Sequence, residues 1–421
     1  MTTPQIISIV VFVAVMALVM SEKRHRAIAA IAGAVILLLT GTITFDVGIA
    51  AVDFNTIGVL IGMMLYVAVV KPCGLFEFIA VKAARLAKGN PWRIMVFFII
   101  ITALLSAMLD NVTTVLLMGP MTLMVCRTLK VNPVPFFLTE IMASNIGGTS
   151  TLIGDPPNIM IGSQAGLTFM DFIKVNGPII VIIIIAIIII FKFMFGRKMH
   201  VTQETMAEIM ELNPKDYIND YRMFRISIAM IIAVTIGFAF HDKLGLQSSI
   251  IALTAAAIML LISSQDFEHT IRDVEWSTIV FFIFLFMVVG AMEHQGVIEM
   301  FANWIVDITH GNVVLTMIVI LWVSAIASAF LDNIPFVATM IPIIFGIQAA
   351  GVDVTPLWWA LSLGACLGGN GTIIGASANV VLCSISERQG HPITFMYFMK
   401  VCFPVMIVTI LLSMVYLLVI F

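Results

Sequence analysis

Charged residues are scarce in this chain, and their scarcity excludes a water-soluble globular fold. Lys, Arg, Asp and Glu make up 11% of the 421 residues, whereas a soluble domain has roughly 25%. Hydrophobic residues make up 61%, and apolar runs long enough to cross ~30 Å of hydrocarbon recur along the whole length. We therefore predict an all-α polytopic membrane protein of the cell membrane, meaning the inner or plasma membrane.

Metal-binding and disulfide patterns are lacking as well. The five cysteines are scattered without a C-x-x-C or Cys/His spacing, so we expect no disulfide framework, no metal and no organic cofactor. The charges at 21–26 follow the first apolar run, 5–20, which is the reverse of their order in a cleavable signal peptide. We therefore predict a retained first helix, and we expect no nucleic-acid partner.

An acid and an amide nevertheless stand inside two strongly apolar segments. Asp110 and Asn111 lie in segment 106–120, and Asp332 and Asn333 lie in segment 328–342, 222 residues later. The similarity extends from VDFNT and VEWST at one end to the prolines of the two segments, and a further motif matches at a separation of 221. An internal repeat of this length in a membrane protein indicates a transporter built from two related halves.

The lysines and arginines predict opposite orientations for the two halves. Segment 71–93 carries five of them, whereas its repeat mate 293–315 carries none. Because Lys and Arg favour cytoplasmic loops, the equivalent segments should face opposite sides of the membrane. We therefore predict two inverted-topology repeats, each with five spans (one of them broken) plus a re-entrant hairpin, and both termini outside the cytoplasm.

The predicted boundaries divide the chain into three parts. The first repeat, 1–195, has spans 5–20, 27–45, 56–71 and 176–195, a hairpin 92–129 and a broken span 134–161. A cytoplasmic linker, 196–225, follows. The second repeat, 226–421, has spans 226–240, 247–263, 276–292 and 398–420, a hairpin 314–347 and a broken span 357–385.

The hairpin tips and the helix breaks supply the candidate site residues. Non-helical backbone at membrane depth is tolerated where it is buried in protein or lines a wet cavity. The substrate-binding candidates are the amides and hydroxyls Asn111, Asn145, Thr149, Ser150, Thr151, Asn333, Asn370 and Thr372. The glycines Gly147, Gly148, Gly368 and Gly369 would line the site with backbone. The candidates for a coupling ion or proton are Asp110, Glu140, Asp155 and Asp332.

Structural roles compete with these functional ones. Asp110, Asp155 and Asp332 could serve as helix N-caps, the glycines could mark close helix packing, and Glu140 could be a structural acid. However, buried carboxylates are expensive in a membrane, and the segments that hold them contain no Lys or Arg. We therefore expect a bound cation or protons to neutralise them, and we expect an anion carrier to need basic groups that these positions lack.

Four segments carry a resemblance to a known family: LDNVTTVLLMGP, NIGGTSTLIGDPPN, LDNIPFVATMIP and GACLGGNGTIIGASANVV. They closely resemble the signature segments of the melanosomal P protein branch of the ion transporter superfamily. That superfamily also holds arsenite efflux permeases, NhaD-type sodium/proton antiporters, and citrate and dicarboxylate carriers. The resemblance implies a hairpin and an unwound helix from each repeat around a midplane site, a scaffold domain that is commonly dimeric, and elevator-type movement.

The resemblance and the residues together predict a secondary transporter and no enzyme. The dicarboxylate carriers of this superfamily have a pattern similar to Ser-Asn-Thr at the hairpin tips, whereas this chain has Leu-Asp-Asn. The difference argues against a carboxylate substrate. We expect the protein to export a small inorganic solute, namely arsenite or antimonite, and to couple this efflux to H⁺ or Na⁺. Membrane lipid is the expected surrounding partner. An arsenite pump would add an ATPase subunit as a partner.

Three alternatives remain open at this point. One is a sodium/proton antiporter, and another is a chloride or anion transporter like the P protein relatives. The third is an intramembrane aspartyl protease that uses Asp110 and Asp332. The protease is disfavoured because such enzymes have motifs similar to Tyr-Asp and Gly-x-Gly-Asp around their two aspartates. Neither motif occurs at Asp110 or Asp332.

Overall fold

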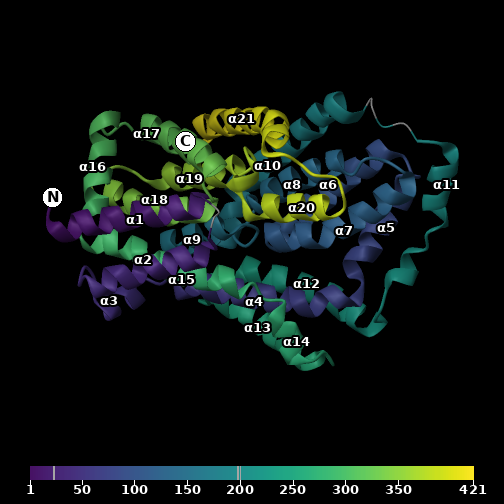
Figure 1. The fold of residues 1–421 in the computed structure, drawn as a ribbon, viewed down its shortest axis with the longest axis horizontal. Helices are drawn as coiled ribbons and strands as arrows, with labels where there is room; N and C mark the ends of the chain where they lie inside the picture. The colour runs from purple at the N-terminus through teal and green to yellow at the C-terminus, as the bar shows by residue number, and fades with distance from the viewer. Residues whose placement is uncertain (22–23, 197–198, 200) are drawn as a thin grey trace.

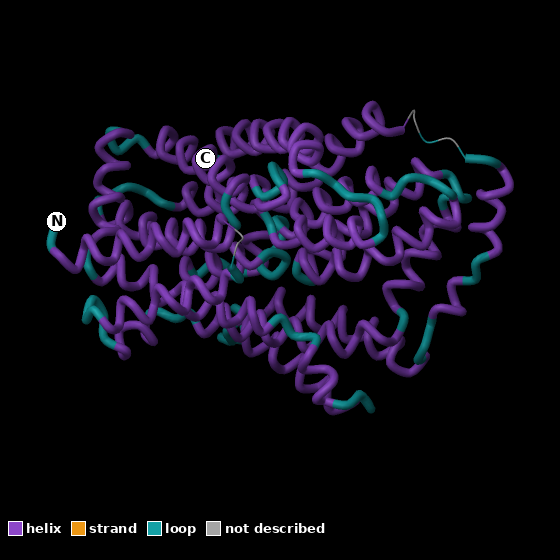
Figure 2. The backbone as a smooth tube through the Cα atoms, in the orientation of Figure 1, coloured by secondary structure: helices purple, strands orange, loops and turns teal. Residues whose placement is uncertain are grey.

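The protein is described by a computed structural model that covers residues 1–21, 24–196, 199 and 201–421, and these residues are almost entirely helical (Figure 1). Short loops join the helices, and no strand occurs within the described residues (Figure 2). Nine helices in this part of the chain are long and apolar enough to cross a membrane. The prediction of an all-α polytopic membrane protein is therefore confirmed.

The first half contains ten α-helices. They are α1 (Thr3–Ser21), α2 (Arg26–Leu39), α3 (Phe45–Ala50), α4 (Phe54–Val70), α5 (Leu75–Leu86), α6 (Pro91–Met108), α7 (Asn111–Leu129), α8 (Val134–Gly148), α9 (Pro156–Ala165) and α10 (Phe169–Phe191). The predicted linker contains α11 (Gln203–Glu211) and a 3₁₀ turn, Pro214–Tyr217.

The second half repeats this order of helices. Its members are α12 (Tyr221–Phe240), α13 (Ser248–Ile262), α14 (Phe267–Arg272), α15 (Trp276–His294), α16 (Val297–Thr309), α17 (Val313–Phe330), α18 (Asn333–Ala349), α19 (Thr355–Gly368), α20 (Ser377–Arg388) and α21 (Phe395–Ile420). From α2 and α13 through α7 and α18, equivalent helices begin 222 residues apart. For α8 and α19, and for α9 and α20, the separation is 221, as the sequence motifs require.

Local backbone geometry repeats as well. Gly74 and Gly296, which precede α5 and α16, both have a positive φ, 85° and 72°. Lys88 and His310, near the ends of the same two helices, have φ values of 55° and 51°. A left-handed conformation is uncommon for a residue with a side chain, so its recurrence at equivalent positions shows that both halves build the same turns.

The packing of the helices brings the halves together at their hairpins. The hairpin arms α6 and α17 pack against α8 and α19, and the second arms α7 and α18 reach across to α20 and α9 of the opposite half. Figure 1 shows α5 and α16 at opposite ends of the molecule, each close to its own hairpin. This arrangement is what inverted repeats would produce, and the orientation of each half in the membrane stays a prediction.

Helix α2 departs from the span predicted at 27–45. It ends at Leu39, where the Thr40 hydroxyl donates to the carbonyl oxygen of Ile36 at 2.9 Å and Gly41 adopts a φ of 66°. A short separate helix, α3, then follows. The apolar run that suggested one long helix is therefore divided by a turn, which hydropathy alone does not reveal.

Candidate functional site

One asparagine holds the backbone of the first helix break, residues 149–155. The side-chain nitrogen of Asn158 donates to three carbonyl oxygens, those of Gly148, Thr149 and Thr151, at 3.4, 3.2 and 2.9 Å. Lipid offers no partner for free carbonyl groups, so this side chain supplies what the broken helix has lost. Proline is tolerated at the first position of α9, where its missing N–H is not needed.

Asn379 does the same at the second break. Its side-chain nitrogen donates to the carbonyl oxygens of Gly369 at 2.7 Å and Thr372 at 2.8 Å. Asn158 and Asn379 are equivalent in the repeat, and both are fully buried. The sequence analysis did not place either among the site residues, although the asparagine that ends both motif copies was the available signal.

The hydroxyls at the breaks are bonded to backbone. Thr151 donates to the carbonyl oxygen of Ala107 in α6 at 2.6 Å, and Thr372 donates to that of Ala329 in α17. The hydroxyls of Thr149 and Ser150 donate to carbonyl oxygens of α8, at 2.7 and 2.6 Å. Each of these four predicted substrate ligands therefore donates to a backbone carbonyl. The equivalent residues Thr151 and Thr372 connect each helix break to the first arm of its hairpin.

Two of the predicted backbone-lining glycines sit where helices touch. A Cβ atom on Gly147 would lie 2.2 Å from the carbonyl oxygen of Ala103, and one on Gly368 would lie 2.5 Å from that of Ala325. Both contacts are with backbone and are too short for any side chain. The close-packing role therefore holds for these two. A Cβ atom on Gly148 would also meet backbone, 2.4 Å from the carbonyl oxygen of Gly154, and Gly148 and Gly369 present their own carbonyl oxygens to the side chains of Asn158 and Asn379.

Both tip aspartates cap the second arm of their hairpin. Asp110 accepts a hydrogen bond from the backbone N–H of Thr113 at 2.8 Å and another from the Thr113 hydroxyl. Asp332 accepts one from the backbone N–H of Ile334 at 3.2 Å. The capping role considered for these residues is present, and at the second tip it is not the whole role.

A chain of buried amides joins the two halves. Asn111 donates to the side-chain oxygen of Asn145 at 3.1 Å. Asn145 in turn donates to the side-chain oxygens of Asn370 at 3.0 Å and Asn379 at 2.9 Å. The side-chain nitrogen of Asn370 is buried and has no partner within the described residues. Three of the predicted amides are thus brought together, with one donor left free to meet a ligand.

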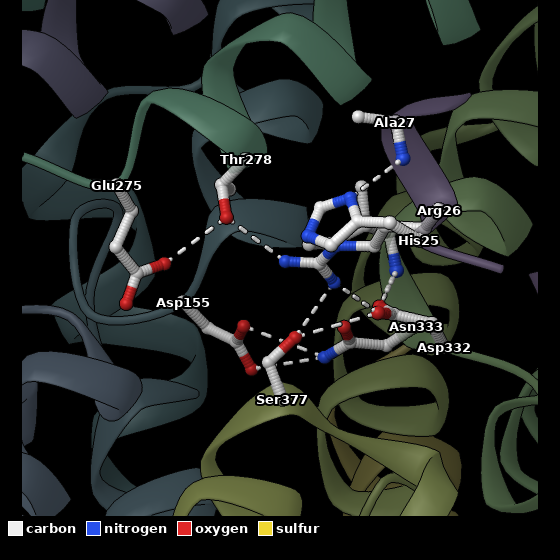
Figure 3. Close-up of polar contacts among 10 residues, drawn as sticks. His25, Arg26, Ala27, Asp155, Glu275, Thr278, Asp332, Asn333 and Ser377 are labelled. Atoms are coloured by element: carbon white, nitrogen blue, oxygen red, sulfur yellow. Dashed lines mark hydrogen bonds and ion pairs between the residues drawn. The ribbon is translucent and has the colours of Figure 1, made fainter. Parts of the chain in front are cut away.

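The fourth predicted amide contacts an acid from the opposite half. Asn333 donates to both carboxylate oxygens of Asp155, at 3.3 and 3.4 Å (Figure 3). Asp155 is fully buried, and its side chain makes no capping hydrogen bond to α9 in the described structure. Its capping role is therefore not supported. Asp155, Asp110 and both tip asparagines instead line a cavity of about 20 Å³ between the halves.

An arginine lies at this cavity, and its presence corrects the expectation that the acids have no basic partner. Arg26, the first residue of α2, places Nη1 2.5 Å from Oδ2 of Asp332. The same nitrogen donates to the Ser377 hydroxyl at 2.8 Å, and Nη2 donates to the Thr278 hydroxyl at 2.9 Å (Figure 3). Arg26 was not among the predicted site residues, because its partners lie more than 250 residues away in the sequence.

A wider cavity of about 500 Å³ adjoins the small one and shares Arg26, Glu275, Thr278 and Ser377 with it. The wider cavity is hereafter called the vestibule, and it is lined by Val19, Met20, Arg24, His25, Arg26, Val112, Glu275, Ser277, Thr278, Asp332, Ile374, Ser377, Val380 and Val381. Basic and acidic side chains therefore meet where residues 24–26 approach the second hairpin tip.

Glu140 is not among the residues around either cavity. It is fully buried between α7 and α8, where the Thr122 hydroxyl donates to Oε1. Its Oε2 atom has no partner among the described residues. Of the four predicted coupling acids, the structure therefore gathers three and leaves Glu140 apart.

The family model described as "Citrate transporter" (CitMHS) matches residues 16–364. The chain belongs to this family. An uncharacterized transporter of Mycobacterium tuberculosis is 40% identical over 98% of this chain and 97% of its own length. One from Synechocystis is 33% identical over 96% of this chain and 95% of its own. The human P protein is 31% identical over 98% of this chain, which spans 59% of that protein.

A solved structure supports the fold at lower sequence similarity. The YdaH transporter of Alcanivorax borkumensis, whose topology is described as unusual, aligns with a TM-score of 0.62 at 13% identity, covering 99% of this chain and 98% of that one. The family and its named relatives are transporters, as is this structural neighbour. This chain is accordingly a membrane transporter of the citrate transporter and P protein type, and the suspected family and its non-enzymatic class are confirmed.

Proposed function

We propose that this chain is a cation-coupled secondary transporter and that the small central cavity binds the coupling ion, H⁺ or Na⁺. The proposal rests on one observation above all. Asp110, Asp155 and Glu275 line a cavity in which Arg26 is the one basic lining residue, and Arg26 is already paired with Asp332. Carboxylates at membrane depth mark ion or proton pathways, and these acids outnumber the described positive charge.

The size of the cavity supports an ion or proton more directly than a larger solute. A water molecule needs ~10–15 Å³ of such volume, so about 20 Å³ holds one water-sized species. A sodium ion or a proton-carrying water fits this space, whereas arsenous acid has four heavy atoms. Sodium/proton exchange is therefore the transport reaction that needs the fewest further assumptions.

Efflux of arsenite or antimonite is a second candidate, in which the solute enters through the vestibule. The free donor of Asn370 and the amide chain leading to it are suited to a neutral solute with three hydroxyl groups. Such a solute needs no basic group. Elevator-type movement of the hairpins against α2 and α15 would expose the site to each side in turn, and it is part of the same proposal.

A third candidate is a polycarboxylate such as citrate, which the family description names. The Leu-Asp-Asn tips argue against a carboxylate substrate, and a second argument was that an anion carrier needs basic groups that the acid-bearing positions lack. Arg24, His25 and Arg26 line the vestibule and remove that argument, because guanidinium groups bind carboxylates well.

Proton flux in proteoliposomes tests these alternatives. The purified protein is reconstituted with an internal pH dye, and sodium, lithium, arsenite, antimonite, citrate and chloride are added separately under a clamped voltage. A pH change evoked by sodium or lithium supports cation exchange, and one evoked by a metalloid or by citrate identifies the coupled solute. A chloride current without any pH response would overturn cation coupling.

A further inference from the structure

Arg26 differs in kind from the other residues around the central cavity. It begins α2, whereas its partners belong to three other helices: Asp332 caps α18, Ser377 begins α20 and Thr278 lies in α15. The guanidinium carbon also lies 5.1 Å from the centre of the Phe281 ring. An arginine fixed by this many partners is part of the site and not a stray surface charge.

We propose that Arg26 is a built-in cation that occupies Asp332 while the coupling ion is absent, and that the coupling ion must displace it. This inference rests on the proposed cation coupling and assigns a specificity-determining residue to it. Arginine stays protonated at all relevant pH values, so deprotonation of Arg26 cannot break its ion pair with Asp332. Asp332 can exchange Arg26 only for another cation, whether a metal ion or a proton.

The neighbouring acids supply the place to which the displaced guanidinium can turn. Thr278 accepts from Nη2 of Arg26, and the Thr278 hydroxyl itself donates to Glu275 at 3.0 Å (Figure 3). A small rotation of the Arg26 side chain would therefore exchange one carboxylate for another. Glu275 therefore offers the half-buried guanidinium a second carboxylate once it leaves Asp332.

The charges that face Arg26 favour this exchange. The small cavity also holds Asp110 and Asp155, and the vestibule adds Arg24 and His25 from the chain just before α2. His25 uses Nδ1 to accept from the backbone N–H of Ala27. An entering cation therefore meets the carboxylates of Asp110, Asp155, Glu275 and Asp332, and Arg26 is the basic residue that is paired with one of them.

The test measures cation binding by the full-length protein in detergent. The thermal unfolding midpoint is followed as sodium replaces choline at constant ionic strength, and separately as pH is varied without sodium. In Arg26→Gln, the half-saturating sodium concentration should fall about tenfold, or the midpoint of the pH response should move up by about one unit, since the internal competitor is gone. Arg26→Lys, which keeps a positive charge, should stay within about threefold of the wild type.

Two further variants make the outcome specific. Arg24→Gln removes a vestibule charge that has no bond to Asp332 in the described structure, and it should lower the half-saturating sodium concentration by less than about threefold. The double variant Arg26→Gln with Asp332→Asn removes both charges of the pair. It should fold as well as the wild type and should lose the tenfold gain.

The possible failures are distinguishable. If the wild type responds to cations but Arg26→Gln binds them no more tightly, the displacement inference is wrong and cation coupling stands. An equal gain in Arg24→Gln would attribute the effect to the general field, which also overturns the inference. If neither the wild type nor any variant responds to sodium, lithium or protons, the proposed function is overturned together with it.

Discussion

At the tip of the first hairpin, Asp110 accepts hydrogen bonds from Thr113, and the neighbouring Asn111 donates to another amide, that of Asn145. At the tip of the second hairpin, Asp332 holds an arginine and the neighbouring Asn333 bonds to an acid. The two tips have the same Asp-Asn sequence, and in both the aspartate caps the helix that follows. They differ in what the opposite half presents to them.

The positions that correspond to the Arg26 cluster show where the difference arises. Ser248 begins α13 as Arg26 begins α2, and its hydroxyl accepts from Asn55 at 3.2 Å. Asp53 stands where the second half has Glu275, and it is bonded to the Thr56 hydroxyl at 2.6 Å and to Ser163 at 3.0 Å. In the first half Asp53 therefore serves as a helix cap. In the second half its counterpart Glu275 lies near the charged Arg26 instead.

The comparison separates two kinds of contact. Bonds that hold the broken backbone occur in both halves, because each break exposes the same carbonyl groups. For example, Ser106 and Ser328 donate to equivalent carbonyl oxygens of α8 and α19, each at 2.6 Å. Charged contacts occur on one side only of the described site. The symmetric contacts therefore stabilise the broken helices, and the asymmetric contacts lie at the proposed ion site.

The largest expected effect breaks the symmetric part. Asn158→Ala and Asn379→Ala each remove a buried amide that donates to two or more carbonyl oxygens of a helix break, so each should destabilise the protein by about 3–5 kcal/mol. The two losses should be similar because the two braces are equivalent. Thermal unfolding in detergent measures both, and a large effect at one position with none at the other would contradict the symmetry.

The next effect concerns the acid that has no counterpart in the second half, where the equivalent residue is Ala376. Asp155→Asn keeps the shape but removes the charge that faces Asn333, and charge-assisted hydrogen bonds are worth up to about 3 kcal/mol. We expect cation-driven proton flux to fall about 100-fold. The exposed Asp353→Asn serves as the control, since that carboxylate lies outside both cavities and accepts from the nearby Thr355 N–H. Full flux in Asp155→Asn would remove this residue from the coupling site.

A smaller effect distinguishes the two tips from each other. Asparagine is a good N-cap, so Asp110→Asn and Asp332→Asn should both fold. Because Asp332 alone holds Arg26, its neutralisation should weaken cation coupling about tenfold and release a guanidinium that binds anions. Asp110→Asn should weaken it about threefold. Cation-dependent flux and anion current give both quantities, and equal effects at the two tips would remove the asymmetry inferred from their contacts.

The sequence predicted the fold well because its signals are local and repeated. Apolar runs, the Asp-Asn tips and the glycine-rich breaks each determine a feature within a few residues of themselves. The exception is α2, where the turn at Thr40 and Gly41 interrupts a run that hydropathy reads as continuous. Hydropathy measures average polarity and is insensitive to one hydroxyl that bonds back to its own helix.

The candidate site was only partly predictable. Amides and acids inside apolar segments point to a site whatever their partners are, so Asn111, Asn145 and Asp155 could be found without a structure. Arg26 could not, because it lies among ordinary loop charges in the sequence and its meaning comes from Asp332, 306 residues away. Conversely, Thr151 and Thr372 resembled ligands in the sequence but are bonded to the hairpin backbone.

The smallest expected effect tests how much asymmetry the amide layer tolerates. Cys366 occupies the position equivalent to Asn145, and its thiol donates to the side-chain oxygen of Asn158 at 3.5 Å. Ser362 donates to the same oxygen at 2.7 Å, so the bracing asparagine keeps a strong partner without the thiol. Cys366→Ser should therefore change transport by less than about twofold, because the serine hydroxyl can donate to Asn158 in place of the weakly donating thiol. Tenfold lower flux of arsenite or antimonite alone, with sodium exchange intact, would instead show that the thiol contacts the metalloid.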